Sequence, residues 1–230
     1  MKMRSPRPVL LPFEDRVQAG KLLAARLGLY RNRPNVIVLG LPRGGVPVGY
    51  QIAQDLEAPL DVLLVRKLGV PGQKELAFGA IAMGGIRVLD ADTIEKLRLA
   101  PEEIEKTAVE EQKLLEYRNE LYRHGRPAAC VCGRAVIIVD DGIATGSTMR
   151  AAVQAIRQQK PSRIVVAAPV ASVEAASMLR EEADEVVCLA QPEPFSAVGY
   201  WYRDFTQVSD EEVRWLLEQA TRAPAAPQPA

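Results

Sequence analysis

The stretch AVIIVDDGIATGSTMRAAV, residues 135–153, decides the fold prediction. It begins as an apolar run typical of a buried parallel strand and ends as the amphipathic start of a helix. In between, two adjacent acids, Asp140 and Asp141, precede a turn rich in glycine and hydroxyl side chains. Two like charges at the mouth of a buried strand are costly unless a positive or hydroxyl-rich group meets them. The stretch therefore predicts a ligand site at a strand end.

Apolar runs and helical patterns alternate along most of the chain, which predicts an α/β fold with a doubly wound parallel sheet. Segment 69–76 is expected to be a loop that leads into a further strand, and Ser209 with Glu212 predicts the capping box of a final helix. No linker is visible, so we expect one domain over residues 1–222, and the Pro- and Ala-rich residues 223–230 are predicted to be disordered. Strands are expected at 35–41, 59–68, 135–139, 163–170 and 185–190, and helices at 14–27, 44–56, 101–122, 147–159 and 172–183.

Composition excludes several classes of protein. The 230 residues carry 29 basic and 29 acidic side chains, so no overall basic field favours nucleic acid or an anionic membrane as a partner. The apolar runs are far shorter than the ~20 residues of a membrane span, and the N-terminus lacks the apolar region of a signal peptide. We therefore expect a soluble, cytoplasmic protein. Cys130, Cys132, Cys188 and His124 fit no zinc-binding spacing and predict free thiols.

The loop after the two acids carries the chemistry. Because it leads directly into a helix, the backbone N–H groups of residues 144–148 and the nearby hydroxyls form a candidate phosphate cradle. The two carboxylates can accept hydrogen bonds from a vicinal diol, and a phosphate with a diol describes a ribose 5-phosphate. Taken singly, each piece also fits an ordinary strand, turn and helix cap. No lysine precedes Ser147 and Thr148, so a Walker loop does not explain the pattern, and G-x-G-x-x-G is absent.

The full string VIIVDDGIATGST resembles the phosphoribosyl pyrophosphate (PRPP) signature of type I phosphoribosyltransferases. With LPRGGVPVG (41–49) and VRKLGVPGQKELAFGAIA (65–82), the chain looks most like a bacterial group of phosphoribosyltransferases without an established acceptor, over residues 13 to about 220. The resemblance implies a small hood formed by the N-terminal segment and about 191–220. It implies Mg²⁺-dependent transfer of 5-phosphoribosyl from PRPP to a nitrogenous base or related acceptor, with release of pyrophosphate, in nucleotide salvage. Two alternatives stay open: a PRPP- or nucleotide-sensing regulator without turnover, and a PRPP-hydrolysing enzyme.

The resemblance also implies the roles of particular residues. Asp140 and Asp141 would hold the ribose hydroxyls near the developing positive charge, with Arg43 and Lys67 as the other catalytic residues. A cis peptide is expected between Pro42 and Arg43, and the loop after the second strand would be a lid that closes over PRPP. The 5-phosphate would be bound by Ala144, Thr145, Gly146, Ser147 and Thr148, and pyrophosphate by Arg43, Gly44, Gly45, Lys67 and Lys74.

Metal, acceptor and partners follow from the same resemblance. Mg²⁺ would be held mainly through PRPP, with Asp140 and Asp141 as candidate ligands. Ala144 stands where hypoxanthine-guanine enzymes have an aspartate, which weakens the case for a 6-oxopurine and leaves the acceptor open. The expected partners are PRPP, a small-molecule acceptor and a second copy in a homodimer, with no nucleic acid and no membrane. The acceptor would stack on aromatic residues of the hood, for which the candidates are Phe195, Tyr200 and Trp201. The alternative is that these aromatic side chains pack against the last helix.

Overall fold

The main element is a five-stranded parallel sheet, with strands in the order β2-β1-β6-β7-β8. The structure is a computed structural model that describes residues 10–70 and 73–222, with residues 73–75 and 222 as backbone only. Every residue of β1 and β6 is buried, as continuous apolar runs covered on both faces should be. The strands of this sheet are β1 Val36–Gly40, β2 Leu60–Val62, β6 Ala135–Val139, β7 Arg163–Val170 and β8 Glu185–Ala190.

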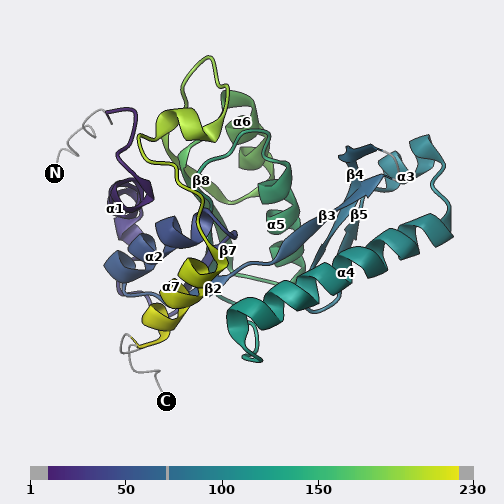
Figure 1. The fold of residues 1–230 in the computed structure, drawn as a ribbon, viewed down its shortest axis with the longest axis horizontal. Helices are drawn as coiled ribbons and strands as arrows, with labels where there is room; N and C mark the ends of the chain where they lie inside the picture. The colour runs from purple at the N-terminus through teal and green to yellow at the C-terminus, as the bar shows by residue number, and fades with distance from the viewer. Residues whose placement is uncertain (1–9, 71–72, 223–230) are drawn as a thin grey trace.

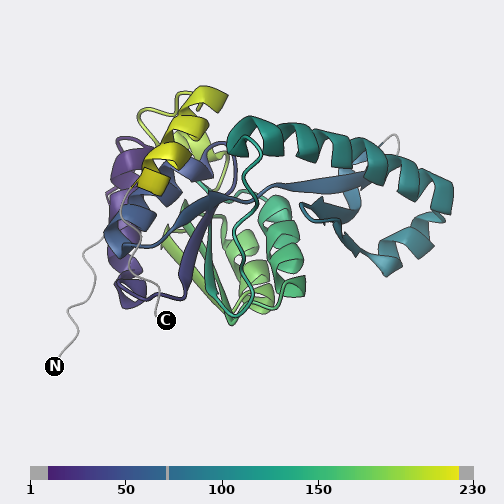
Figure 2. The same cartoon turned by 90° about the horizontal axis from the view of Figure 1, so that it is seen from below.

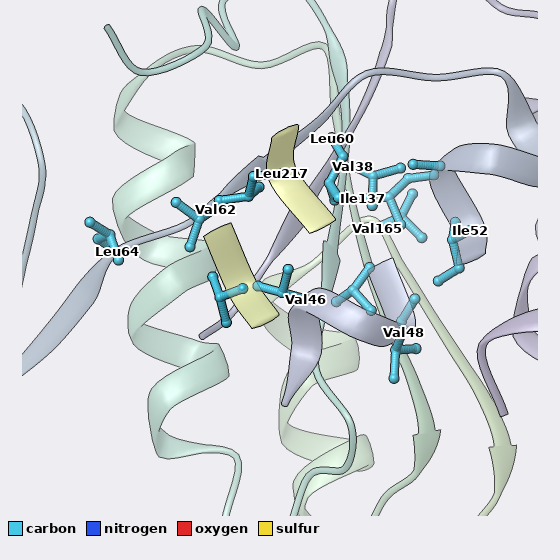
Figure 3. Close-up of a cluster of buried hydrophobic side chains, with 14 of the residues drawn as sticks. Val38, Val46, Val48, Ile52, Leu60, Val62, Leu64, Ile137, Val165 and Leu217 are labelled. Atoms are coloured by element: carbon cyan, nitrogen blue, oxygen red, sulfur yellow. The ribbon is translucent and has the colours of Figure 1, made fainter. Parts of the chain in front are cut away.

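Helices cover both faces of this sheet, which confirms the predicted doubly wound α/β fold (Figure 1). Alternate residues of each strand point to opposite faces and enter two separate cores. In the first core, Val38, Ile137 and Val165 meet side chains of α2 and α7, as Figure 3 shows. In the second, Ile138 and Val166 meet α5 and α6. The covering helices are α1 Arg16–Arg26, α2 Gly45–Leu56, α5 Ser147–Gln158, α6 Val173–Glu182 and α7 Asp210–Arg222.

A second, three-stranded antiparallel sheet projects from one side of the main sheet and is backed by a long helix (Figures 1 and 2). We call this part the arm. Leu115 and Ala108 of its long helix are buried, whereas about half of the residues of that helix are exposed to solvent. The arm consists of β3 Val65–Val70, β4 Gln73–Ala82, β5 Ile86–Leu89, α3 Ala91–Leu97 and α4 Pro101–Arg123.

The arm corrects two predictions. The single strand expected over 59–68 is two strands, because the chain leaves the main sheet after Val62 and β3 pairs with β4 instead. The loop expected over 69–76 is mostly strand, since β3 runs to Val70 and β4 begins at Gln73. The run is apolar on both sides of the break, and both Leu63 and Leu64 are buried. Hydrophobic periodicity therefore gave no sign of the change of sheet.

A buried arginine at the end of α4 binds to β2 of the main sheet. Arg123, at the end of α4, is 4% exposed and pairs with Asp61 of β2, with Nε 3.1 Å from Oδ1. Its Nη2 donates to the Val62 carbonyl at 2.6 Å, and Nη1 donates to Asn119. A charge so buried is tolerated because it is paired and its donors are satisfied.

The segment before α1 lies beside the segment that precedes α7. Phe13 forms a parallel bridge with Tyr202, and the Asp204 N–H donates to the Glu14 carbonyl at 2.9 Å. Short 3-10 turns, Gly28–Tyr30 and Val198–Trp201, complete the fold. All three cysteines are free, as predicted. Among residues 10–70 and 73–222, no helix is long and apolar enough to cross a membrane. The tail predicted to be disordered, 223–230, lies outside the described residues.

Candidate active site

The carboxyl ends of β1 and β6 bring two loops together. These strands are parallel neighbours, with Gly40 paired with Val139, so the loop after β1 and the acids after β6 leave the same sheet edge side by side. A Cβ built on Gly44 would lie 1.9 Å from Oδ2 of Asp141. The Asp141 carboxylate therefore rests against the Gly44 backbone. Doubly wound sheets bind ligands at this edge.

The loop after β1 packs so tightly that two glycines are required. A Cβ on Gly45 would lie 2.3 Å from the carbonyl oxygen of Val139, which belongs to the central strand. The Leu41 N–H donates to that same oxygen at 2.8 Å. The peptide between Pro42 and Arg43 is cis, which confirms the prediction. At Gly44 and Gly45, this loop therefore presents only backbone to the end of β6 and its acids.

The loop before α5 has the features of an anion site. Gly146 has φ +75°, and a Cβ there would lie 2.6 Å from the Met178 methyl, so glycine is needed at this turn. The Ser172 hydroxyl donates to the Ala144 carbonyl at 2.7 Å and fixes the loop from the start of α6. Within the described chain, the N–H groups of residues 144–146 and Thr148 donate to no other protein group. Free N–H groups at a helix start attract anions.

The two adjacent carboxylates lie in unequal environments. Burial raises the pKa of Asp140 well above 3.8, and the neighbouring Asp141 charge raises it further. Burial also raises the pKa of Asp141, but the Arg16 guanidinium opposes that shift. No cation in the described chain forms a corresponding ion pair with Asp140. Ionised Asp140 is therefore the less stable charge of the pair.

We predict that Asp140→Asn stabilises the fold. Because the pKa of Asp140 is raised in the folded state, stability is lost as pH rises from about 3.8 through that raised pKa. Removing the charge should raise the free energy of unfolding at pH 7 by about 0.5–2 kcal/mol, the usual range for one stabilising substitution. Urea unfolding at pH 7 measures it. Exposed Glu110→Gln is the control, and an Asp140→Asn variant less stable than wild type would contradict the prediction.

Arg16, which the sequence did not single out, forms an ion pair with Asp141. We call Asp140 and Asp141 together the diacid. Arg16 is the first residue of α1, and its Nε lies 2.8 Å from Oδ2 of Asp141. The two side chains are only 11% and 13% exposed. On the other side, the Tyr202 hydroxyl donates to the Asp141 carbonyl at 2.5 Å. The start of α1 and the segment before α7 thus both contact the second acid.

The three basic residues predicted to bind pyrophosphate do not all lie at the edge of the main sheet. Arg43 lies on the loop after β1, about one-third exposed, with Nη1 4.0 Å from Oδ1 of Asp210. Lys67 lies within β3 of the arm, opposite Ala80, rather than at an end of the main sheet. Its ammonium forms no ion pair with any described carboxylate. Lys74 belongs to β4, but its side chain lies outside the described part of the structure.

A cavity of about 680 Å³ opens beside the loop before α5. Ala144 and Thr145 line one side, and Phe195 lines another. Trp201 packs behind Phe195, with ring centroids 6.2 Å apart, whereas Tyr200 is 73% exposed and does not line the cavity. Of the three predicted acceptor residues, Phe195 thus lines the cavity directly. Trp201 does not line it but packs against Phe195.

Comparison with known proteins identifies the family. The family model for the phosphoribosyl transferase domain matches residues 13–202. The chain belongs to this family. It is 49% identical over 212 residues to "Putative phosphoribosyl transferase Rv0571c" of Mycobacterium tuberculosis H37Rv, and equally to the corresponding protein of strain CDC 1551. These matches cover 91% of this chain and 47% of each relative, so the chain spans about half the length of the curated relatives it matches.

One solved structure is similar to this chain over most of its length. The crystal structure of TT1426 from Thermus thermophilus superposes with a TM-score of 0.83 at 45% identity, over 91% of this chain and 99% of that one. The resemblance to type I phosphoribosyltransferases and the predicted fold class are confirmed. The roles of individual residues of this family member stay predictions, and the arrangement above is what supports them.

Proposed function

We propose that this protein transfers the 5-phosphoribosyl group of PRPP to a nitrogenous base or related acceptor and releases pyrophosphate. The observation that carries the proposal is the contact between the Asp141 carboxylate and the Gly44 backbone, beside the free N–H groups at the start of α5. One sheet edge thus combines an acidic pair for a diol, a glycine loop for one anion and a helix start for another.

The proposed chemistry assigns a role to each part of this edge. The acceptor nitrogen contributes the electron pair of the new bond to C1, and the bond from C1 to pyrophosphate breaks with its electron pair going to the leaving oxygen. Positive charge develops on the ribose, where Asp140 and Asp141 stabilise it and bind the hydroxyls. Residues 144–148 hold the 5-phosphate. Arg43, Gly44 and Gly45 stabilise pyrophosphate as it departs. Lys67 and Lys74, which belong to strands of the arm, are the further candidates for this role.

The residues at this edge fit a Mg²⁺ ion that the protein and the substrate would coordinate together. The adjacent carboxylates of Asp140 and Asp141 offer oxygen ligands, and the described chain contains no group of three His, Cys, Asp or Glu side chains that could hold a metal. Mg²⁺ is commonly bound by one or two carboxylates with substrate phosphates and water. When bound, it would neutralise charge on the pyrophosphate oxygens. These two acids would hold it on the protein side.

The cavity beside Ala144 is the proposed acceptor site, and its charge restricts the acceptor. Its walls include Phe195 and Met178, and its charged side chains are Glu174 and Glu193. No lysine or arginine is among the described residues that line it. An acceptor anion would meet two carboxylates and no partner, which costs binding energy. We therefore infer a neutral or cationic acceptor with a flat ring that stacks on Phe195.

Pyrophosphate release tests the proposed reaction. With PRPP, Mg²⁺ and a panel of bases, we expect release that depends on a base. Tight PRPP binding with no release for any base would favour the sensing alternative. Release at full rate without a base would favour hydrolysis. Absence of PRPP binding would overturn transfer, hydrolysis and the sensing of PRPP.

A matched pair of acceptors tests the charge of the cavity. Nicotinamide and nicotinate share one ring and differ in charge, and uracil and orotate differ similarly. We expect the neutral member of a pair to bind at least about 10-fold more tightly, equivalent to about 1.4 kcal/mol. Titration calorimetry measures it, and Glu174→Gln with Glu193→Gln should narrow the difference. Tighter binding of the anion by wild type would contradict the inference.

A further inference from the structure

Arg16 connects three segments that are distant in the sequence. Its Nε donates to Oδ2 of Asp141 at 2.8 Å, and its Nη1 donates to the Thr206 carbonyl at 2.8 Å. Its guanidinium carbon lies 4.0 Å from the centroid of the Phe205 ring. The start of α1, the acid after β6 and the segment before α7 therefore meet at one side chain.

This contact fixes the Asp141 carboxylate in one orientation. Oδ2, the oxygen that accepts from Arg16, is also the oxygen nearest Gly44. The carboxylate is thus wedged between a guanidinium and a backbone, and the Tyr202 hydroxyl holds the main-chain carbonyl of the same residue. A buried carboxylate without such partners would turn toward solvent or toward other donors.

The position of Arg16 in its own helix indicates that the contact serves something other than the helix. A cation in the first turn opposes the helix dipole, and this first turn has no acidic residue. The helix is capped instead by Asp15, whose side chain accepts from the Gln18 N–H at 2.7 Å. An arginine at this place therefore gives α1 no local stabilisation.

We propose that Arg16 is a positioning residue, which holds the Asp141 carboxylate against the Gly44 loop so that the other face of the diacid is ready for the ribose hydroxyls. The proposal rests on the proposed function, because it assumes that PRPP occupies this sheet edge. Arg16 acts through Asp141 and contacts no reacting atom. Its planar fork reaches Asp141 and Thr206 at once, which a lysine ammonium does not reproduce.

Titration calorimetry with PRPP, followed by steady-state kinetics, tests this role. For Arg16→Gln we expect PRPP to bind roughly 10-fold more weakly and kcat/KM for PRPP to fall by about 10²-fold, while KM for the acceptor changes little. Arg16→Lys should recover part of the loss. Arg26→Gln, an exposed arginine of the same helix, is the matched control for loss of one charge.

Chemical rescue separates positioning from a merely structural role. In Arg16→Ala, millimolar guanidinium should restore part of the kcat/KM for PRPP, because it can occupy the vacated place between Asp141 and Phe205. Wild-type affinity for PRPP in Arg16→Gln would overturn the proposal, as would a lower melting temperature with unchanged kinetic constants. If wild type itself binds no PRPP, the proposed function fails, and this proposal fails with it. Should Arg16→Gln not fold, Arg16→Lys is compared with wild type, and wild-type affinity for PRPP in Arg16→Lys would then overturn the proposal, because a lysine ammonium does not reach Asp141 and Thr206 at once.

Discussion

The double substitution Asp140→Asn with Asp141→Asn is expected to abolish PRPP-dependent pyrophosphate release, by at least about 10³-fold. Removal of one preorganised charge or donor at a reacting centre typically costs about 10²–10³-fold, and this change removes both negative charges near the ribose. Amides keep the shape of the carboxylates but leave the developing positive charge without a partner. Pyrophosphate release under saturating PRPP measures the loss.

The fold should survive this change, because the backbone around the acids is held independently. The Asp140 N–H donates to the Ala167 carbonyl at 3.2 Å, and the Asp141 carbonyl accepts from Tyr202. Circular dichroism and melting temperature therefore serve as controls. Glu110→Gln with Glu120→Gln removes two exposed charges of α4, away from the site, and should leave turnover within a few-fold. Wild-type turnover in the double asparagine variant would refute the role of the diacid.

Much of the main sheet could be predicted from the sequence because its strands are short, continuous apolar runs. Val36–Gly40 and Ala135–Val139 are buried on both faces, and a turn or helix start follows each. The loop after the second run was predictable for a different reason, since glycine and hydroxyl residues before a helix have a specific anion-binding chemistry. Short stretches of sequence are enough to predict an element when the residues within that stretch determine its structure.

The arm was predicted poorly because its boundary is not local. The run PLDVLLVRKL has apolar residues on both sides of the break, and only the pairing of Val65 with Ala82 shows that a second sheet begins there. The partner strand is β4, which follows later in the chain. Arg66 of β3 also forms an ion pair with Glu111 of α4. No window of sequence around residue 63 contains this information.

Arg16 was missed for a similar reason. It lies 125 residues from Asp141, and the contact exists because Phe13 pairs with Tyr202 and brings the start of α1 to the sheet edge. One signal was available in the sequence: an arginine at the start of a helix, where the dipole disfavours a cation. That signal marks an arginine with a partner elsewhere but does not name the partner.

The adjacent glycines of the loop after β1 should respond differently to alanine, and this contrast tests how the site is built. In Gly44→Ala, the new methyl group would fall 1.9 Å from Oδ2 of Asp141. The end of an aspartate side chain can move, so the fold should tolerate the change. The carboxylate would then leave its place beside Arg16. We expect a loss of about 10²-fold or more in kcat/KM for PRPP. Loss of the Arg16–Asp141 ion pair should also lower the free energy of unfolding, but by less than in Gly45→Ala.

In Gly45→Ala, the methyl group would instead fall 2.3 Å from the Val139 carbonyl, which is fixed in the central strand. Backbone cannot yield as a side chain can, so we expect the free energy of unfolding to drop by about 1–3 kcal/mol or more. Gly28→Ala, where a Cβ would meet nothing within 4 Å, is the neutral control. Urea unfolding and PRPP kinetics on all three variants separate the two effects. If Gly44→Ala retained full activity, the wedge between Gly44 and Asp141 would have no catalytic role, because the carboxylate could then work from a second position.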